Sequence, residues 1–185
     1  MSGYSGNLSA SAPFGALSGM GQHARMADVI VSPEYGAYIR GMNRILTDLP
    51  VATTNPIDAG IARFCLTCKI CAEACPFGAL PMGDPSYDRP APADAYVSGF
   101  KGWVVNYEKC PFCAACHATC PFNSIQASFI HGLVKATVAT TPVFDSFFAS
   151  MERSFHYGFK DPESWWDLPY QPSQGVDPKF VANTL

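Results

Sequence analysis

The residues that could do chemistry in this chain are eight cysteines, arranged in two runs of one spacing. Each run reads C-x2-C-x2-C-x3-C and is followed directly by proline. Thiolates at these intervals hold a [4Fe–4S] cluster, in which three come from one tight loop and the fourth from further away. The runs are Cys65, Cys68, Cys71 and Cys75, and then Cys110, Cys113, Cys116 and Cys120. The sequence therefore predicts two [4Fe–4S] clusters, which are one-electron carriers.

The fourth cysteine of each run decides how the clusters are shared. In two-cluster ferredoxins it binds the cluster of the other run. This exchange predicts one cluster on Cys65, Cys68, Cys71 and Cys120, and a second on Cys110, Cys113, Cys116 and Cys75. The two runs would then be tied into a single fold.

Other uses of these cysteines fit the spacing less well. A disulfide framework suits short secreted chains and needs no repeated C-P run. Zinc sites favour two C-x2-C pairs separated by a loop, without a third cysteine two residues on. His117 lies between Cys116 and Cys120 and could replace a thiolate, but four cysteines already complete each set.

Composition narrows the classes of function. Of 185 residues 48% are hydrophobic, only 15% are charged, and the formal net charge is −3. Without a basic stripe, nucleic-acid binding is not expected. No apolar run is long enough to span a membrane. The first 22 residues have neither a basic n-region nor a twin arginine, so no signal peptide is expected, and we expect Met1 to be an internal methionine or the edge of a fragment.

The organisation outside the cysteine runs is less regular. Residues 28–32 form a β-branched run that predicts a strand, and residues 50–56 form a Pro/Thr linker. The insert 81–100 is expected to be a loop. Thr141, Pro142 and Gly158 predict a helix with its two ends, and residues 161–178 an extended arm. The predicted helix carries an aromatic stripe that we expect in the core, at Phe144, Phe147, Phe148, Met151 and Phe155.

Four stretches around the cysteine repeat resemble corrinoid-dependent reductive dehalogenases. They occur in the order that this family shows, and together they cover nearly the whole chain. They are Leu17–Arg25 (LSGMGQHAR), Ser32–Arg40 (SPEYGAYIR) with Ile45–Pro50, Asn55–Asp58 leading into Phe64 and Cys65, and Phe155–Gly158 with Asp161–Asp167 (DPESWWD). Any one stretch is a weak signal, but all four around a doubled cluster motif are strong.

The resemblance implies a fold of the α+β class in three parts. Residues 1–60 would be the incomplete end of a nitroreductase-like corrinoid-binding domain. Residues 61–127 would be a ferredoxin-like domain with two [4Fe–4S] clusters. Residues 128–185 would be C-terminal helices and an extended tail.

The resemblance also implies a chemistry. In this family a cobalamin-type corrinoid, reduced through the two clusters, removes halogen from an organohalide, and hydrogen takes its place. The tyrosine that is the family's proton donor lies in an N-terminal part without counterpart here. We therefore expect the C-terminal part of such an enzyme, inactive alone. The expected partners are an organohalide, an electron donor, a membrane-anchor subunit and a second copy in a homodimer. Family members are typically exported to the outer face of the cytoplasmic membrane.

Candidate residues beside the cysteines follow from the same resemblance. Arg40 and Arg25 are candidates for catalytic cations that hold a departing halide or polarise the substrate. A second group would approach or shape the corrinoid, with glycines allowing close contact of the backbone. It comprises Gly19, Gly21, Glu34, Tyr35 and Gly36. Trp103 is expected to shield a cluster.

Two other functions stay open at this point. The first is a stand-alone two-cluster ferredoxin-type carrier, because the second run keeps ferredoxin spacing where many dehalogenases place its first cysteine far upstream. The second is an enzyme similar to epoxyqueuosine reductase, which shares clusters and corrinoid. The tail with Trp165 and Trp166 and the Thr47–Pro50 segment favour the dehalogenase over the latter.

Overall fold

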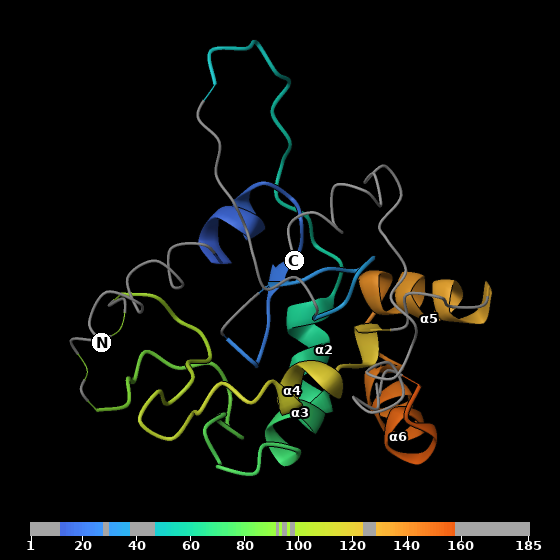
Figure 1. The fold of residues 1–185 in the computed structure, drawn as a ribbon. Coiled ribbons are helices and arrows are strands. Elements are labelled where there is room, and N and C mark those ends of the chain that lie inside the picture. Colours follow the sequence, from blue (N-terminus) through green and yellow to red (C-terminus); the bar gives the residue numbers. More distant parts are fainter. Residues whose placement is uncertain are drawn as a thin grey trace, which may run out of the picture.

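The computed structural model describes residues 12–27, 30–37, 47–91, 93, 96, 99–123 and 129–157. This part of the chain is mostly helical, with one short sheet (Figure 1). Residues 12–17 are helical. The elements that follow are β1 (Gln22–His23), β2 (Ile30–Val31), α2 (Ile61–Cys68), α3 (Ile70–Glu73), α4 (Ala115–Ala118), the 3-10 helix η2 (Pro121–Asn123), α5 (Phe129–Thr140) and α6 (Asp145–Phe155).

The sheet ties the N-terminal segment to the first cysteine helix. β1 and β2 pair antiparallel, with Gln22 opposite Val31. The strand expected at residues 28–32 is therefore present at its centre. The side-chain oxygen of Gln22 accepts hydrogen bonds from the backbone N–H groups of Ala59 (2.9 Å) and Ile61 (3.0 Å), which satisfies a free donor at the start of α2. The expected domain boundary at residue 60 stays a prediction.

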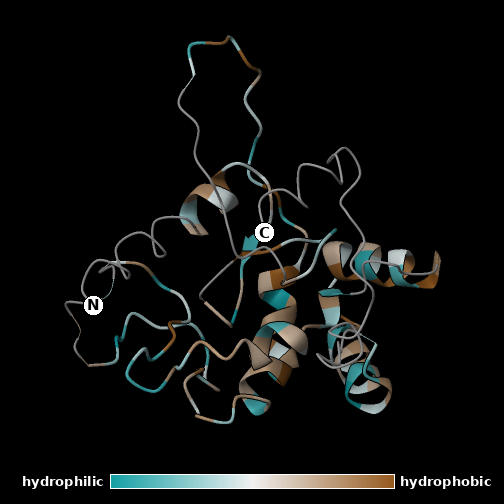
Figure 2. Ribbon diagram, viewed as in Figure 1, coloured by the Kyte–Doolittle hydropathy of each residue, from teal (hydrophilic) through white to brown (hydrophobic). Residues whose placement is uncertain are grey.

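The core is built around the cysteine helices. In Figure 1, α3 continues from α2, α4 lies against α3, and α5 and α6 both lie on the right of α2, which they contact. Figure 2 shows mainly hydrophobic colours on α2 and α3, whereas α6 mixes both kinds. Phe64 of α2 meets Phe122 of η2 edge to face at 5.6 Å between ring centroids. Buried cysteines of both runs belong to this core.

The two cysteine runs share a local backbone conformation. Lys69 (φ 56°) and Ala114 (φ 62°) occupy the same position of the repeat, and both adopt the left-handed conformation. A short helix then starts directly after each of them, α3 with Cys71 and α4 with Cys116. A left-handed conformation costs about 1 kcal/mol or more in a residue with a side chain. The repetition of this strain indicates that the cysteine geometry requires it.

The C-terminal helices differ from the sequence expectation in three ways. α6 begins at Asp145 rather than at Pro142, and it ends at Phe155 because His156 (φ 53°) takes the left-handed position expected of Gly158, which lies outside the described residues. Only part of the aromatic stripe reaches the core: Phe148 is half-buried and packs against it, whereas Phe144, Phe147 and Phe155 are exposed. The buried face of α6 carries Asp145, Ala149 and Glu152 instead. α5 falls in the range 128–185 for which the resemblance implies C-terminal helices.

Two segments lie away from the core. Residues 47–58 are exposed along their whole length and extend from the body, as expected of a linker. The described residues between 81 and 100 form no long helix or strand, which agrees with the expected loop. Among the helices that the structure describes, none combines the length and hydrophobicity needed to cross a membrane.

Candidate metal centres

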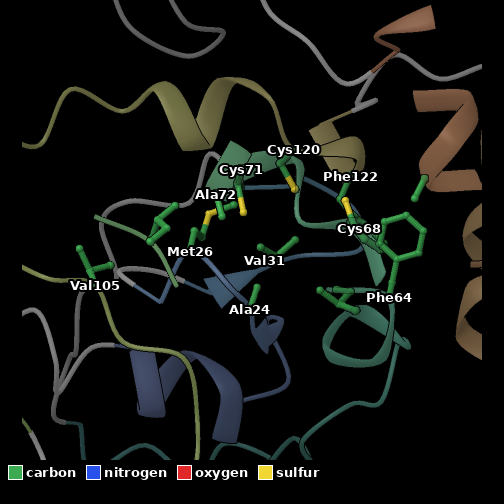
Figure 3. Close-up of a cluster of buried hydrophobic side chains, with 14 of the residues drawn as sticks. Ala24, Met26, Val31, Phe64, Cys68, Cys71, Ala72, Val105, Cys120 and Phe122 are labelled. Carbon is green, nitrogen blue, oxygen red and sulfur yellow. The ribbon is translucent and has the colours of Figure 1, made fainter. Parts of the chain in front are cut away.

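Three thiols of the first run and one of the second surround a first cavity. It lies between α2, α3, β2 and the start of η2, and its thiols are Cys65, Cys68, Cys71 and Cys120. α2 places Cys65 and Cys68 one helical turn apart, so both lie on one face. Figure 3 shows Cys71 and Cys120 next to each other, with their sulfur atoms directed to the side on which Val31 lies. Met26, Val31, Phe64 and Phe122 supply an apolar wall.

The remaining four thiols surround a second cavity. They are Cys75, Cys110, Cys113 and Cys116. Met26 lines both cavities, so the two lie next to each other. The thiols of the second cavity are the less buried ones, since Cys113 is exposed whereas Cys68, Cys71 and Cys120 are buried. The structure thus brings together the two sets that exchange of the fourth cysteine predicts.

Burial dominates the electrostatics of the first cavity. It raises the pKa of the Cys68 thiol to about 12. Burial and the neighbouring thiol of Cys65 also raise the pKa of Cys71 and Cys120, and the effect of Cys65 on Cys120 reflects the closeness of the two runs. Thiolates are the metal ligands, so iron must displace protons from these sites.

Cys75 in the second cavity has the opposite environment. Burial disfavours its thiolate, but the backbone N–H groups of residues 77 to 80 outweigh burial and lower the pKa of Cys75. The amide of Ala79 donates to the Cys75 sulfur at 3.3 Å. Hydrogen bonds to cluster sulfurs are one means by which proteins set cluster potentials. This turn is therefore built to receive a negatively charged sulfur.

The donor set fits clusters better than the alternatives. None of the eight cysteines forms a disulfide, so the described chain has no disulfide framework. Within the described residues, no group of three or more His, Cys, Asp or Glu side chains is placed to hold a single metal ion. Four thiols spaced around an apolar cavity suit a cluster with four iron corners rather than one zinc ion.

The structure describes only one of the two arginines that are candidates for a catalytic role. Arg40 lies outside the described residues. Arg25 is fully buried, and its guanidinium donates to the backbone carbonyls of Cys65 (3.0 and 2.9 Å), Pro81 (2.7 Å) and Gly83 (2.7 Å). Nη2 also donates to the Leu66 carbonyl at 3.5 Å, so backbone carbonyls take up the donors of the guanidinium. This environment gives no support to the catalytic role expected of Arg25, which stays a prediction.

The glycine candidates make close contacts within the chain. A Cβ atom on Gly36 (φ +67°) would lie 2.5 Å from Oδ1 of Asn123, and one on Gly21 would collide with the Val31 carbonyl. One on Gly19 would collide with the Asn55 carbonyl. These contacts account for the glycines by packing of the backbone, and their role in corrinoid binding stays a prediction.

Glu34 and Tyr35 lie at the tip of a turn. The Ser32 hydroxyl accepts hydrogen bonds from both of their backbone N–H groups, at 3.2 and 3.3 Å. Ser32 and Gly36 bridge the base of the turn. Both tip side chains are exposed, and neither lines one of the two cavities. Their predicted part in the corrinoid pocket is untested.

The sequence analysis did not identify one set of buried hydrogen bonds. Asn123 is fully buried; its Oδ1 accepts from the Ala37 amide at 2.9 Å and its Nδ2 donates to the His117 carbonyl at 2.6 Å. Nδ1 of His117 is 2.9 Å from the Ala37 carbonyl. These hydrogen bonds link the turn at 32–36 to the second cysteine run. The only sequence signal was a lone asparagine after C-P-F.

Comparison with known proteins agrees with this geometry. Residues 64–124 match the 4Fe-4S dicluster domain family. The chain is 49% identical over 157 residues to a trichloroethene reductive dehalogenase of Dehalococcoides mccartyi strain 195, covering 83% of this chain and 28% of that protein. It is 31% identical over 184 residues to a tetrachloroethene reductive dehalogenase of Sulfurospirillum multivorans, covering 95% of this chain and 36% of the relative. The chain thus spans about a third of the length of these relatives.

Solved structures show the same fold. One is a catabolic reductive dehalogenase in complex with 3-bromo-4-hydroxybenzoic acid, with a TM-score of 0.63 and 24% identity over 79% of this chain and 21% of that one. Another is a reductive dehalogenase whose structure suggests a mechanism for B12-dependent dehalogenation, with a TM-score of 0.59 and 23% identity. The matched fold, the dicluster domain and the identity over nearly the whole sequence converge on one family. The chain belongs to the reductive dehalogenases, as a homologue of their C-terminal part that carries a 4Fe-4S dicluster domain.

Proposed function

We propose that this chain is the electron-delivering and corrinoid-flanking part of a reductive dehalogenase. One observation carries the proposal: each cavity is lined by three thiols of one run and one of the other. Two [4Fe–4S] clusters held there would lie side by side, since Met26 contacts both cavities. When bound, the clusters supply one-electron transfer at low potential.

The chain's own residues prepare these sites. Phe64, Phe122 and Val31 exclude water from the first cavity, and Leu80 and Val105 help to do so in the second. The backbone N–H groups after Cys75 stabilise negative charge on its sulfur. Together they would keep the ligands fixed and dry, which lowers the reorganisation that each electron transfer requires.

The corrinoid, the substrate and the location form the finer part of the proposal. A cobalamin-type corrinoid is supported by the B12 dependence suggested for a structural relative. Relatives named for trichloroethene and tetrachloroethene make chlorinated ethenes the first organohalides to test. We further propose an electron donor, a membrane-anchor subunit, a homodimer, and action at the outer face of the cytoplasmic membrane.

A stand-alone ferredoxin-type carrier is the second candidate. The ferredoxin spacing of both runs favours it. Against it, similarity to dehalogenases extends well beyond residues 64–124 to cover 83–95% of the chain. A carrier alone would not require those flanks.

The first experiment is anaerobic reconstitution of the whole chain with iron and sulfide. We expect about eight iron and eight sulfide per chain and an EPR signal from two interacting reduced clusters. Recovery of zinc in stoichiometric amounts, without sulfide, would contradict the proposal.

A further inference from the structure

Arg25 is a buried cation that joins separate segments beside the first cavity. It is 0% exposed. Its Nε and Nη2 donate to the Cys65 carbonyl in α2, and Nη1 donates to the carbonyls of Pro81 and Gly83, both at 2.7 Å. Arg25 also lines the first cavity. A charged side chain therefore lies in the wall of the site proposed for a cluster.

Trp103 fixes the plane of this guanidinium. The Arg25 Cζ atom lies 4.8 Å from the centroid of the Trp103 ring. The indole is itself held, because Nε1 donates to the Gly83 carbonyl at 3.0 Å and the side chain is 3% exposed. A planar cation on an indole face is favourable, and more so when both are removed from water. These contacts hold the guanidinium at the wall of the first cavity.

The charge of Arg25 has no carboxylate partner in the part of the chain that the structure describes. Its described partners are backbone carbonyls and the Trp103 ring. Arg153 provides the contrast: it pairs with Glu73 at 2.8 Å and its side chain is 40% exposed. Burying an unpaired charge costs free energy, because the ion loses its hydration. Carbonyl dipoles offset part of that cost, and a negative group in the adjoining cavity would offset more.

Geometry places this charge beside the proposed ligands. Arg25 lines the first cavity together with all four of its thiols. The guanidinium donates to the Cys65 carbonyl at 3.0 and 2.9 Å, so it lies next to the residue that supplies one of these thiols.

We propose that Arg25 is the fixed counter-charge of the cluster held by Cys65, Cys68, Cys71 and Cys120, and that it raises the reduction potential of that cluster. The inference rests on the proposed binding of clusters. Reduction adds one electron, supplied by a low-potential one-electron donor, and no bond forms or breaks. The added negative charge is stabilised by the nearby cation, because a cluster's net electrostatic environment sets its potential. Arg25 is thus a positioning residue and not a catalytic one.

The test is an EPR-monitored redox titration of the reconstituted chain and its variants. Arg25→Gln removes the charge and keeps a side-chain donor, whereas Arg25→Lys keeps the charge and loses the planar fork. We expect Arg25→Gln to lower the midpoint of the first cluster, so that the ratio of reduced to oxidised cluster falls roughly tenfold at the wild-type midpoint. The second cluster should be unchanged, and Arg25→Lys should lower the first midpoint far less.

Arg153→Gln is the matched control, because Arg153 also donates to the carbonyl of a proposed ligand, Cys68. Its charge is paired and partly exposed, so we expect almost no change in potential. The proposal would be overturned, in favour of a role through hydrogen bonds alone, by either of two results. One is an unchanged midpoint potential of the first cluster in Arg25→Gln, and the other is an equal fall of that midpoint in Arg25→Gln and Arg25→Lys. If Arg25→Gln does not assemble its clusters, the midpoint potential of the first cluster in Arg25→Lys becomes the test. A tenfold fall in the ratio of reduced to oxidised cluster in Arg25→Lys would contradict the proposal.

Loss of the first cluster in both Arg25 variants, with the second intact, would likewise reduce Arg25 to a structural residue and overturn the inference. Iron and sulfide content separates this failure from that of the proposed function. A wild-type chain without clusters contradicts the proposed function itself. A fully loaded wild type whose Arg25→Gln variant keeps its potentials contradicts only the inference on Arg25.

Discussion

Cys120, from the second cysteine run, lines the same cavity as Cys65, from the first. The converse holds for Cys75, which lines a cavity with three thiols of the second run. Each cavity therefore loses a ligand when the fourth cysteine of the other run is changed. This reciprocity makes the assignment of ligands testable by two substitutions.

We expect Cys75→Ser to damage the cluster of the second cavity and Cys120→Ser to damage that of the first. Each variant should retain about four of eight iron atoms if the damaged cluster is lost. Mössbauer or EPR spectroscopy of the two variants should give complementary spectra. If each substitution instead removed the cluster of its own run, the exchange of fourth cysteines would be wrong.

Substitution of Asn123 should destabilise the cluster-loaded chain. Asn123→Ala leaves the buried Ala37 amide and the His117 carbonyl without this partner. We expect a loss of about 2 kcal/mol, which corresponds to a fall of roughly 4–8 °C in the midpoint of thermal unfolding. Loss of the visible cluster absorption on heating measures it. Asn55→Ala, at an exposed position, should leave the midpoint within about one degree; an equal fall in both variants would argue against the buried link.

Some of this arrangement could be predicted from sequence because ligand spacing is a strong constraint. Two runs of identical spacing leave few ways to surround two clusters, and the structure groups the eight thiols accordingly. The short helices after Lys69 and Ala114 also follow from the repeat. The dehalogenase family could be recognised because its marker stretches keep their order along the chain.

Other features depend on contacts that produce no periodic pattern in the sequence. The partners of Arg25 are backbone carbonyls, which any residue can provide, so its burial could not be foreseen. The residues of α5 give no helical pattern of their own, because Gly132 and several β-branched residues weaken the helix signal and only Val138 among its described residues is buried. On α6 the aromatic period correctly predicts a helix, but of the predicted core stripe Phe148 packs against the core while Phe144, Phe147 and Phe155 are exposed.

We expect the ionisation of His23 to make the free energy of unfolding depend on pH. Burial lowers the pKa of His23, opposed in part by its hydrogen bond to the Trp103 carbonyl (3.2 Å). Below a pH of about 6.5 the unfolded chain takes up a proton that the folded chain resists. Stability should therefore fall as the pH drops below that value, towards the folded pKa.

We expect His23→Gln to lose part of this dependence. The urea concentration that removes half of the cluster absorption, measured anaerobically between about pH 5.5 and 8, should vary less in the variant than in the wild type. Parallel curves for the two proteins would show that His23 does not carry the effect.

The last prediction separates electron transfer from dehalogenation. Electron transfer requires only clusters in a dry, fixed environment, and all eight thiols needed for that lie around the two cavities. Removal of halogen requires in addition a reacting centre and a proton donor held in near-attack geometry against the carbon–halogen bond. The 185 residues correspond to only 28–36% of the length of the dehalogenases they match. We therefore expect the reconstituted 185-residue polypeptide to oxidise reduced viologen in the presence of a generic acceptor.

The same polypeptide should release no chloride from trichloroethene or tetrachloroethene, even with added cobalamin, beyond the slow reaction of free cobalamin. That reaction is the control, measured at the same cobalamin and reductant concentrations. A Cys120→Ser variant gives a second control, because it should slow viologen oxidation without changing the background release of chloride. Chloride release well above the free-cobalamin rate, and lost in the Cys120→Ser variant, would show that these residues suffice for catalysis. The part of the relatives that has no counterpart here would then be dispensable for the reaction, against the physical argument that enclosure of the corrinoid and a fixed proton donor are required.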